Sequence, residues 1–173
     1  MNKDALSRRY TSLWTGETVS AALFASLLIW YAYRDGQCQH WVARIYSLGV
    51  VIFILIQGVF WWRWKLHVLK QGKRTLPSSV LHRYRQWRTI NWWLIGAFPL
   101  VVLGGAALTG QPVNSVDTWL GLLFLGGAIL EQVNYYYVQL MYSSRYDWRY
   151  LKTNGRLRPG TVAKALRQEH LES

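Results

Sequence analysis

The stretch VARIYSLGVVIFILIQGVFWW, from Val42 to Trp62, decides the fold because it is apolar along nearly its whole length. A helix needs about 20 mostly apolar residues to cross the hydrocarbon core of a bilayer. The stretch therefore predicts a membrane-spanning helix at about residues 42–63.

Three further apolar stretches lie at about residues 14–34, 90–109 and 118–142. The first stretch ends in the large aromatic residues Trp30 and Tyr31. A cleaved signal peptide normally ends in small residues, so we expect this stretch to be retained as a helix.

Composition agrees with a membrane protein, because charged residues make up only 16% of the chain and hydrophobic residues 51%. Soluble domains carry about 25% charged residues. The sequence thus predicts an all-α fold, an integral membrane four-helix bundle in residues 1–150, followed by a basic cytoplasmic tail in residues 151–173.

The distribution of charge predicts the orientation of this bundle. The chain has twenty Lys and Arg against eight Asp and Glu, and only Arg34 and Arg44 lie beside the predicted outer turns. Basic residues in short loops remain in the cytoplasm. We therefore expect both termini to be cytoplasmic and the membrane to be a bacterial inner (plasma) membrane.

The basic cytoplasmic face should contact anionic lipid headgroups, each Lys or Arg gaining about 1 kcal/mol there. This interpretation is preferred to nucleic-acid binding for the basic and aromatic run HRYRQWR. The residues assigned to this face are Arg63, Lys65, Lys73, Arg74, Arg83, Arg85, Arg88, Arg145 and Arg149.

Helix signals also place the cytoplasmic segments. Gly72 and Pro77 indicate the end of one helix and the start of the next, so the hairpin between the second and third helices projects into the cytoplasm. Asn154 and Gly155 indicate a stop, and Thr161 opens a short amphipathic C-terminal helix.

The fourth apolar stretch contains several polar residues, which are the candidate functional residues. Glu131, Asn134, Tyr135, Val138 and Tyr142 follow at spacings of three and four, so they form one stripe of a helix. The stripe continues through the preceding residues Ala128, Gly127 and Phe124. A polar stripe in hydrocarbon should face protein.

Glu131 is the most informative of these residues. It lies fourteen residues before Arg145, and a rise of about 1.5 Å per residue then places it near the middle of the bilayer. Three alternatives are open: the carboxyl group is protonated and neutral, it pairs with Arg44, or it lines a polar seam shared with other subunits. By the same count Gln57 and Gln139 share a level, so their amides could bond across the bundle.

No catalytic motif occurs in the chain, and neither a metal nor a cofactor is predicted. The four histidines lie outside the apolar cores, so a haem between two helices is not expected. Glu131 and Asn134 are similar in type and spacing to the pigment ligands of light-harvesting-like helices. However, Tyr136 stands where that pattern has Arg.

The sequence favours a non-enzymatic protein that oligomerises or serves as an accessory subunit, packing through the polar stripe of the fourth helix. One alternative is a homo-oligomeric pore or ion- or proton-conducting element lined by Glu131, Asn134 and Gln139. Another is a lipid-, pigment- or cofactor-binding subunit of a membrane enzyme.

Overall fold

The computed structural model describes residues 3–33, 41–73, 75–110, 112–140, 145–155 and 157–172. Within these residues the chain is helical apart from short connections and one isolated antiparallel bridge between Val138 and Pro159. The fold class predicted from the sequence, an all-α protein, is confirmed for the described residues.

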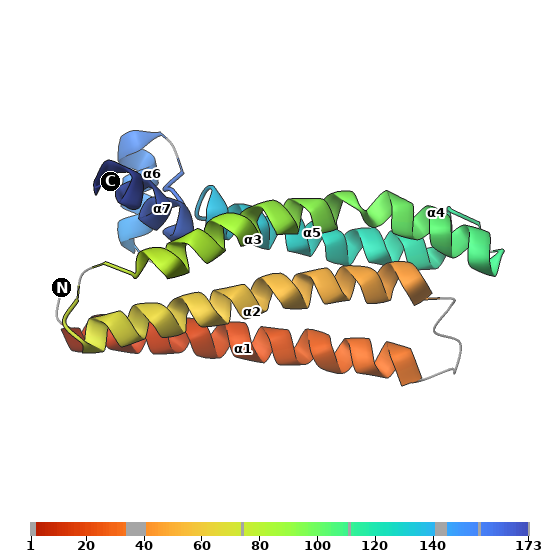
Figure 1. The fold of residues 1–173 in the computed structure, drawn as a ribbon, viewed down its shortest axis with the longest axis horizontal. Coiled ribbons are helices and arrows are strands. Elements are labelled where there is room, and N and C mark those ends of the chain that lie inside the picture. The colour runs from red at the N-terminus through yellow and green to blue at the C-terminus, as the bar shows by residue number, and fades with distance from the viewer. Residues whose placement is uncertain are drawn as a thin grey trace.

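Four long helical segments run back and forth along the molecule (Figure 1). They are long and apolar enough to cross a membrane, as the sequence predicts. The segments are α1 (Lys3–Tyr33), α2 (Val42–Lys70), α3 with α4 (Ser78–Gly96 and Phe98–Thr109) and α5 (Val116–Tyr136).

The third segment is interrupted at Ala97, between α3 and α4. Pro99 follows two residues later, and a proline both lacks an N–H donor and crowds the carbonyl four residues before it. The amide of Val101 donates to the carbonyl of Ala97 at 3.1 Å, so helical hydrogen bonding resumes at once. The break therefore leaves α3 and α4 as one segment of membrane-spanning length.

Helix α2 forms the core of the bundle. It packs against α1, α5, α4 and α3, and Leu48, Ile54 and Trp61 on it are completely buried. Helix α1, in contrast, lies mainly along α2 and contains no buried residue. The bundle is therefore built around one central helix, with α1 as its most exposed member.

The tail folds back onto the end of the bundle where α1 begins and α5 ends (Figure 1). Helix α6 (Arg145–Asn154) ends before Gly155, which has φ +62°, and α7 (Thr161–Glu172) follows. Both boundaries agree with the helix signals in the sequence. Val162 and Ala165 of α7 join the core, so the tail is packed and not a free extension.

Helix α5 ends earlier than the sequence predicts, at Tyr136 instead of near residue 142. The residues that follow Tyr136 instead pair with the segment before α7. The amide of Gln139 donates to the carbonyl of Arg158 at 2.8 Å, and that of Gly160 donates to the carbonyl of Tyr137 at 3.1 Å. The bond from Gln139 replaces the helical bond that its amide would donate in a longer α5, because each amide donates only once.

Candidate functional site

Three buried amide side chains connect α2, α3 and α5 close to the tail. Gln57 and Asn91 exchange two hydrogen bonds, from Gln57 Nε2 to Asn91 Oδ1 at 2.8 Å and from Asn91 Nδ2 to Gln57 Oε1 at 2.9 Å. Asn91 Nδ2 also donates to Gln132 Oε1 at 2.8 Å. We call Gln57, Asn91 and Gln132 the amide cluster.

Two tyrosines and one backbone carbonyl complete the hydrogen bonds of the amide cluster. The Tyr136 hydroxyl donates to Gln57 Oε1 at 2.8 Å, and the Tyr84 hydroxyl donates to the Gln57 carbonyl at 2.7 Å. Gln132 Nε2 donates to the Arg88 carbonyl at 3.1 Å. Buried polar groups are costly unless they are paired, so this arrangement fixes the register of three helices.

The hydrogen bonds of Gln57 differ from the pairing with Gln139 that the sequence suggested. Gln57 bonds to Asn91 and Tyr136, whereas Gln139 lies beyond the end of α5, next to the tail. The expected pairing assumed that the fourth helix continues past Gln139. Its early end at Tyr136 removes Gln139 from the bundle interior.

A second cluster lies on another side of α2 and contains two carboxyl groups. Glu17 of α1 and Glu131 of α5 are close enough for their charges to interact, and Tyr135 lies beside Glu17. Gly58 makes room for them, because a Cβ there would overlap the Tyr135 hydroxyl and lie 3.1 Å from Glu17 Cδ. We call Glu17, Glu131 and Tyr135 the carboxyl site.

The carboxyl site is less completely hydrogen-bonded than the amide cluster. Asn134 Nδ2 reaches Glu131 Oε2 only at 3.5 Å, the limit of a hydrogen bond. The Tyr135 hydroxyl faces Glu17 but makes no hydrogen bond of good geometry among the described residues. This site therefore holds polar groups with unused hydrogen-bonding capacity.

The structure also changes the level of Glu131 along the bundle. Helix α5 ends five residues after Glu131, a rise of about 7 to 8 Å. Glu131 lies level with Glu17, where the apolar part of α1 begins. It is therefore near the tail end of the apolar segments and not at their middle, as the count from Arg145 had suggested.

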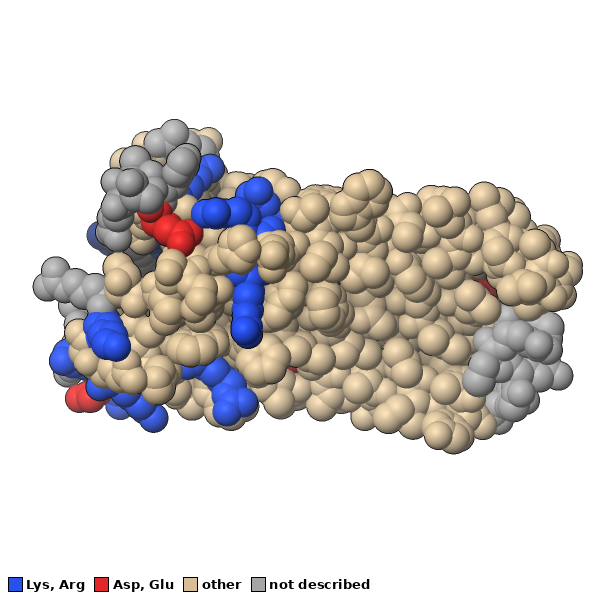
Figure 2. All heavy atoms as spheres, viewed as in Figure 1, with Lys and Arg blue, Asp and Glu red and all other residues tan. Residues whose placement is uncertain are grey.

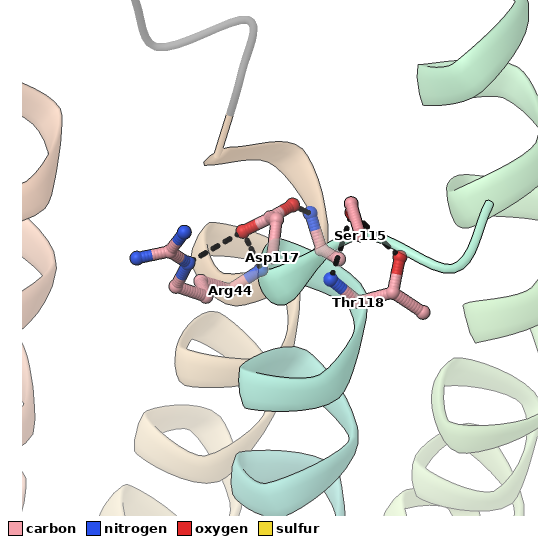
Figure 3. Close-up of polar contacts among 5 residues, drawn as sticks. Arg44, Ser115, Asp117 and Thr118 are labelled. Carbon is pink, nitrogen blue, oxygen red and sulfur yellow. Dashed lines mark hydrogen bonds and ion pairs between the residues drawn. The ribbon is translucent and has the colours of Figure 1, made fainter. Parts of the chain in front are cut away.

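Arg44 pairs with Asp117, which corrects the alternative in which Arg44 pairs with Glu131. Figure 3 shows the Asp117 carboxylate beside the start of α2. Arg44 Nε donates to Asp117 Oδ1 at 2.7 Å, and the backbone amides of Ala43 and Arg44 donate to the same carboxylate at 2.8 and 3.3 Å.

Asp117 thereby caps a helix that is distant from it in the sequence. The first amides of a helix have no partner within that helix, and its N-terminus attracts negative charge. The Arg44 guanidinium also lies over the Trp41 ring, 4.2 Å from its centroid. This pair closes the end of the bundle opposite the tail, far from Glu131.

The other residues of the predicted stripe lie against the same chain. Tyr135 is buried, and Val138 forms the bridge to Pro159. Asn134 Oδ1 accepts from the Leu140 amide at 3.0 Å, so Asn134 holds the turn that follows α5. From Glu131 to Val138 the stripe faces protein, as expected, but that protein is its own tail and α1 and α2. At Gly127 it faces open space instead. Tyr142 lies outside the described residues.

Basic side chains gather at the tail end of the molecule, whereas the long middle of the visible face carries none (Figure 2). Arg85 forms an ion pair with Glu169 of α7 at 3.1 Å. Arg74 and the side chain of Arg145 lie outside the described residues. The described members of the predicted basic face are Arg63, Lys65, Lys73, Arg83, Arg85, Arg88 and Arg149.

Sequence reasoning missed most of the residues that build these clusters. Glu17 and Asn91 each lie only a few residues inside the start of a predicted apolar stretch, at about residues 14–34 and 90–109, and were given no role there. An amide or carboxyl group near the end of an apolar stretch is a usable signal of a buried polar contact when the helix continues beyond it. The residues missed are Glu17, Gly58, Tyr84, Asn91, Asp117, Gln132 and Tyr136.

Comparison with protein-family models, with curated proteins and with solved structures finds no match for this chain. Within the described residues, no group of three or more His, Cys, Asp or Glu side chains is arranged to hold a metal ion.

Proposed function

We propose that this chain is a small multi-pass membrane protein that acts by association, as a homo-oligomer or as an accessory subunit of a larger membrane complex. The observation that carries the proposal is an exposed face of α5. Leu123 and Leu130 are 68% and 60% exposed, and Gly126 and Gly127 lie between them with open space where a side chain would be. We call these four residues the glycine face.

Small residues favour association because helices in lipid attract each other by close packing and not by the hydrophobic effect. Other glycines already serve this purpose within the chain. A Cβ at Gly121 would lie 2.9 Å from the Ala43 backbone, and one at Gly105 would lie 3.5 Å from Val42. The glycine face offers the same close approach to a helix from outside.

This proposal places association on the part of α5 that precedes Glu131, because Gly127 lies one helical turn before Glu131 and faces open space. From Glu131 to Val138 the stripe is covered by the tail and by α1 and α2, so that part no longer offers a free surface for a partner. We further propose that the tail end is cytoplasmic in a bacterial inner membrane. The gathering of basic residues at that end supports this orientation.

Substituting Gly127→Leu tests the proposal, because no other described part of the chain lies within 4 Å of a Cβ at this position. Native mass spectrometry in mild detergent should show the wild type as an oligomer or with a bound partner. The variant should associate about tenfold more weakly, a loss of about 1.4 kcal/mol. The control is Leu108→Phe, which adds bulk at a side chain that is 89% exposed and outside the glycine face. A wild type that is monomeric in detergent and in lipid nanodiscs would refute the proposal.

The pore alternative is distinguished by Glu131→Leu. In that proposal Glu131, Asn134 and Gln139 line a path between copies, so assembly should persist while proton leak into liposomes changes. Association through the glycine face predicts unchanged leak, because Glu131 lies against Glu17 in the same chain.

A further inference from the structure

A cavity of about 520 Å³ lies at the tail end, where α1 and α2 meet the tail. Its walls come from the first turns of α1, the last turns of α2, the chain after α5, and both tail helices. We call it the basic cavity. Among the residues assigned to the basic face from the sequence, Lys65 alone lines it.

Four cationic side chains line the basic cavity: Arg9, Lys65, Arg158 and Lys164. They come from four separate parts of the chain, and none of the described lining residues is acidic. Lys65 and Lys164 are close enough for their like charges to interact. Folding therefore brings positive charges together around a hollow that an anion could fill.

Uncharged groups of the basic cavity suit the same kind of ligand. The Thr161 hydroxyl is buried and has no hydrogen-bond partner among the described residues. Tyr10 and Trp62 form an aromatic wall, with ring centroids 5.7 Å apart. Such aromatic residues are typical of the headgroup layer of a membrane.

A phosphate group matches these features better than a carboxylate does. It carries more negative charge and more acceptor oxygens, so several cations and a hydroxyl can contact it at once. Arginine binds phosphate by paired hydrogen bonds and lysine by its point charge. The four cations come from four separate parts of the chain, so a group with several acceptor oxygens can contact more than one of them at once.

We infer that the basic cavity binds a phosphate group. Two sources supply it, the headgroup of an anionic phospholipid or a soluble phosphate compound. This inference does not depend on association through the glycine face, since the two surfaces share no residue.

The test uses the full chain in detergent and two probes, dioctanoyl phosphatidic acid and inorganic pyrophosphate, with dioctanoyl phosphatidylcholine for comparison. The unfolding midpoint of the wild type should rise with phosphatidic acid or pyrophosphate, and the titration gives an apparent Kd. Binding should weaken about thirtyfold in Lys65→Gln with Lys164→Gln, since each cation is worth about 1 kcal/mol.

The matched control is Lys70→Gln with Lys152→Gln, which removes the same charge from exposed positions that lie outside the basic cavity and outside the basic face assigned from the sequence. If only phosphatidic acid binds, the source is a lipid, and if pyrophosphate also binds, a soluble compound suffices. Lys164→Gln alone, compared with Lys152→Gln, replaces the double variant if the latter does not fold. The inference is overturned if neither probe binds, or if cavity and control variants weaken binding equally.

Discussion

Gln57 of the amide cluster and Gly58, which makes room for the carboxyl site, are adjacent residues of α2. The two clusters differ in how completely their polar groups are hydrogen-bonded. Gln57 points to α3 and α5, where neutral amides and hydroxyls bond to one another. Gly58 faces α1 and α5, where two carboxyl groups and a tyrosine meet with few good hydrogen bonds.

The difference suggests that the two clusters have different roles. A set of neutral groups in which every buried polar atom has a hydrogen-bond partner stabilises one packing arrangement and leaves little for a ligand. A set of acidic groups with spare capacity contributes less to stability and can respond to changes around it. Substitutions in the amide cluster should therefore affect the fold most, and substitutions in the carboxyl site least.

Asn91→Leu should have the largest effect. The substitution keeps a similar volume but removes three hydrogen bonds, leaving Gln57 and Gln132 with unpaired groups in a dry interior. We expect the free energy of unfolding in detergent to fall by about 2 to 3 kcal/mol, because membrane hydrogen bonds are individually modest but unpaired groups are costly.

Gln86→Leu is the matched control for this prediction, since it removes an amide from an exposed position of the same helix. It should change the free energy of unfolding by less than about 0.5 kcal/mol. Equal losses in the two variants would show that the amide cluster does not hold the bundle together.

Gly58→Ala should have an intermediate effect. Its new methyl group would overlap the Tyr135 hydroxyl and crowd the Glu17 carboxyl group, so the ring or α1 must shift. We expect a loss of about 1 to 2 kcal/mol in the free energy of unfolding, typical of overpacking. A detergent unfolding titration measures it.

Two further variants locate the cause of that loss. Gly49→Ala places the same methyl group elsewhere on α2, where nothing lies within 4 Å, so it should be neutral or slightly stabilising. Adding Tyr135→Phe to Gly58→Ala removes the overlapping hydroxyl but leaves the ring carbon that carried it 2.7 Å from the new methyl group, so it should restore only part of the stability. A double variant no more stable than Gly58→Ala alone would mean that overlap with the hydroxyl is not the cause of the loss.

The sequence alone predicted the long helices and the tail helix because these depend on local pattern. A run of apolar residues and the helix end at Gly155 are each recognised from neighbouring residues in the sequence. The end of α5 depends instead on pairing between Val138 and Pro159, which lie on different segments. No local signal near Tyr136 marks that end.

The same error carried over to the candidate site. Counting depth from Arg145 assumed a continuous helix, so Glu131 was placed too far from the tail and within reach of Arg44. Arg44 instead meets Asp117 at the opposite end. The amide cluster was missed because its partners come from three helices, and only their packing brings them together.

Neutralising the carboxyl site should have the smallest effect and sharpens the comparison most. Glu131→Gln and Glu17→Gln each keep the shape of the side chain and remove one of two interacting charges. Either variant alone should change the free energy of unfolding by no more than about 0.5 kcal/mol. We expect a small gain and not a loss, since like charges near each other are unfavourable. The double variant should gain no more than the better single variant, because one substitution already removes the repulsion. A detergent unfolding titration of all four proteins completes the cycle. A loss of about 2 kcal/mol in the free energy of unfolding from either single variant, comparable to that of Asn91→Leu, would contradict this comparison. It would show that the carboxyl site stabilises the fold as much as the amide cluster does.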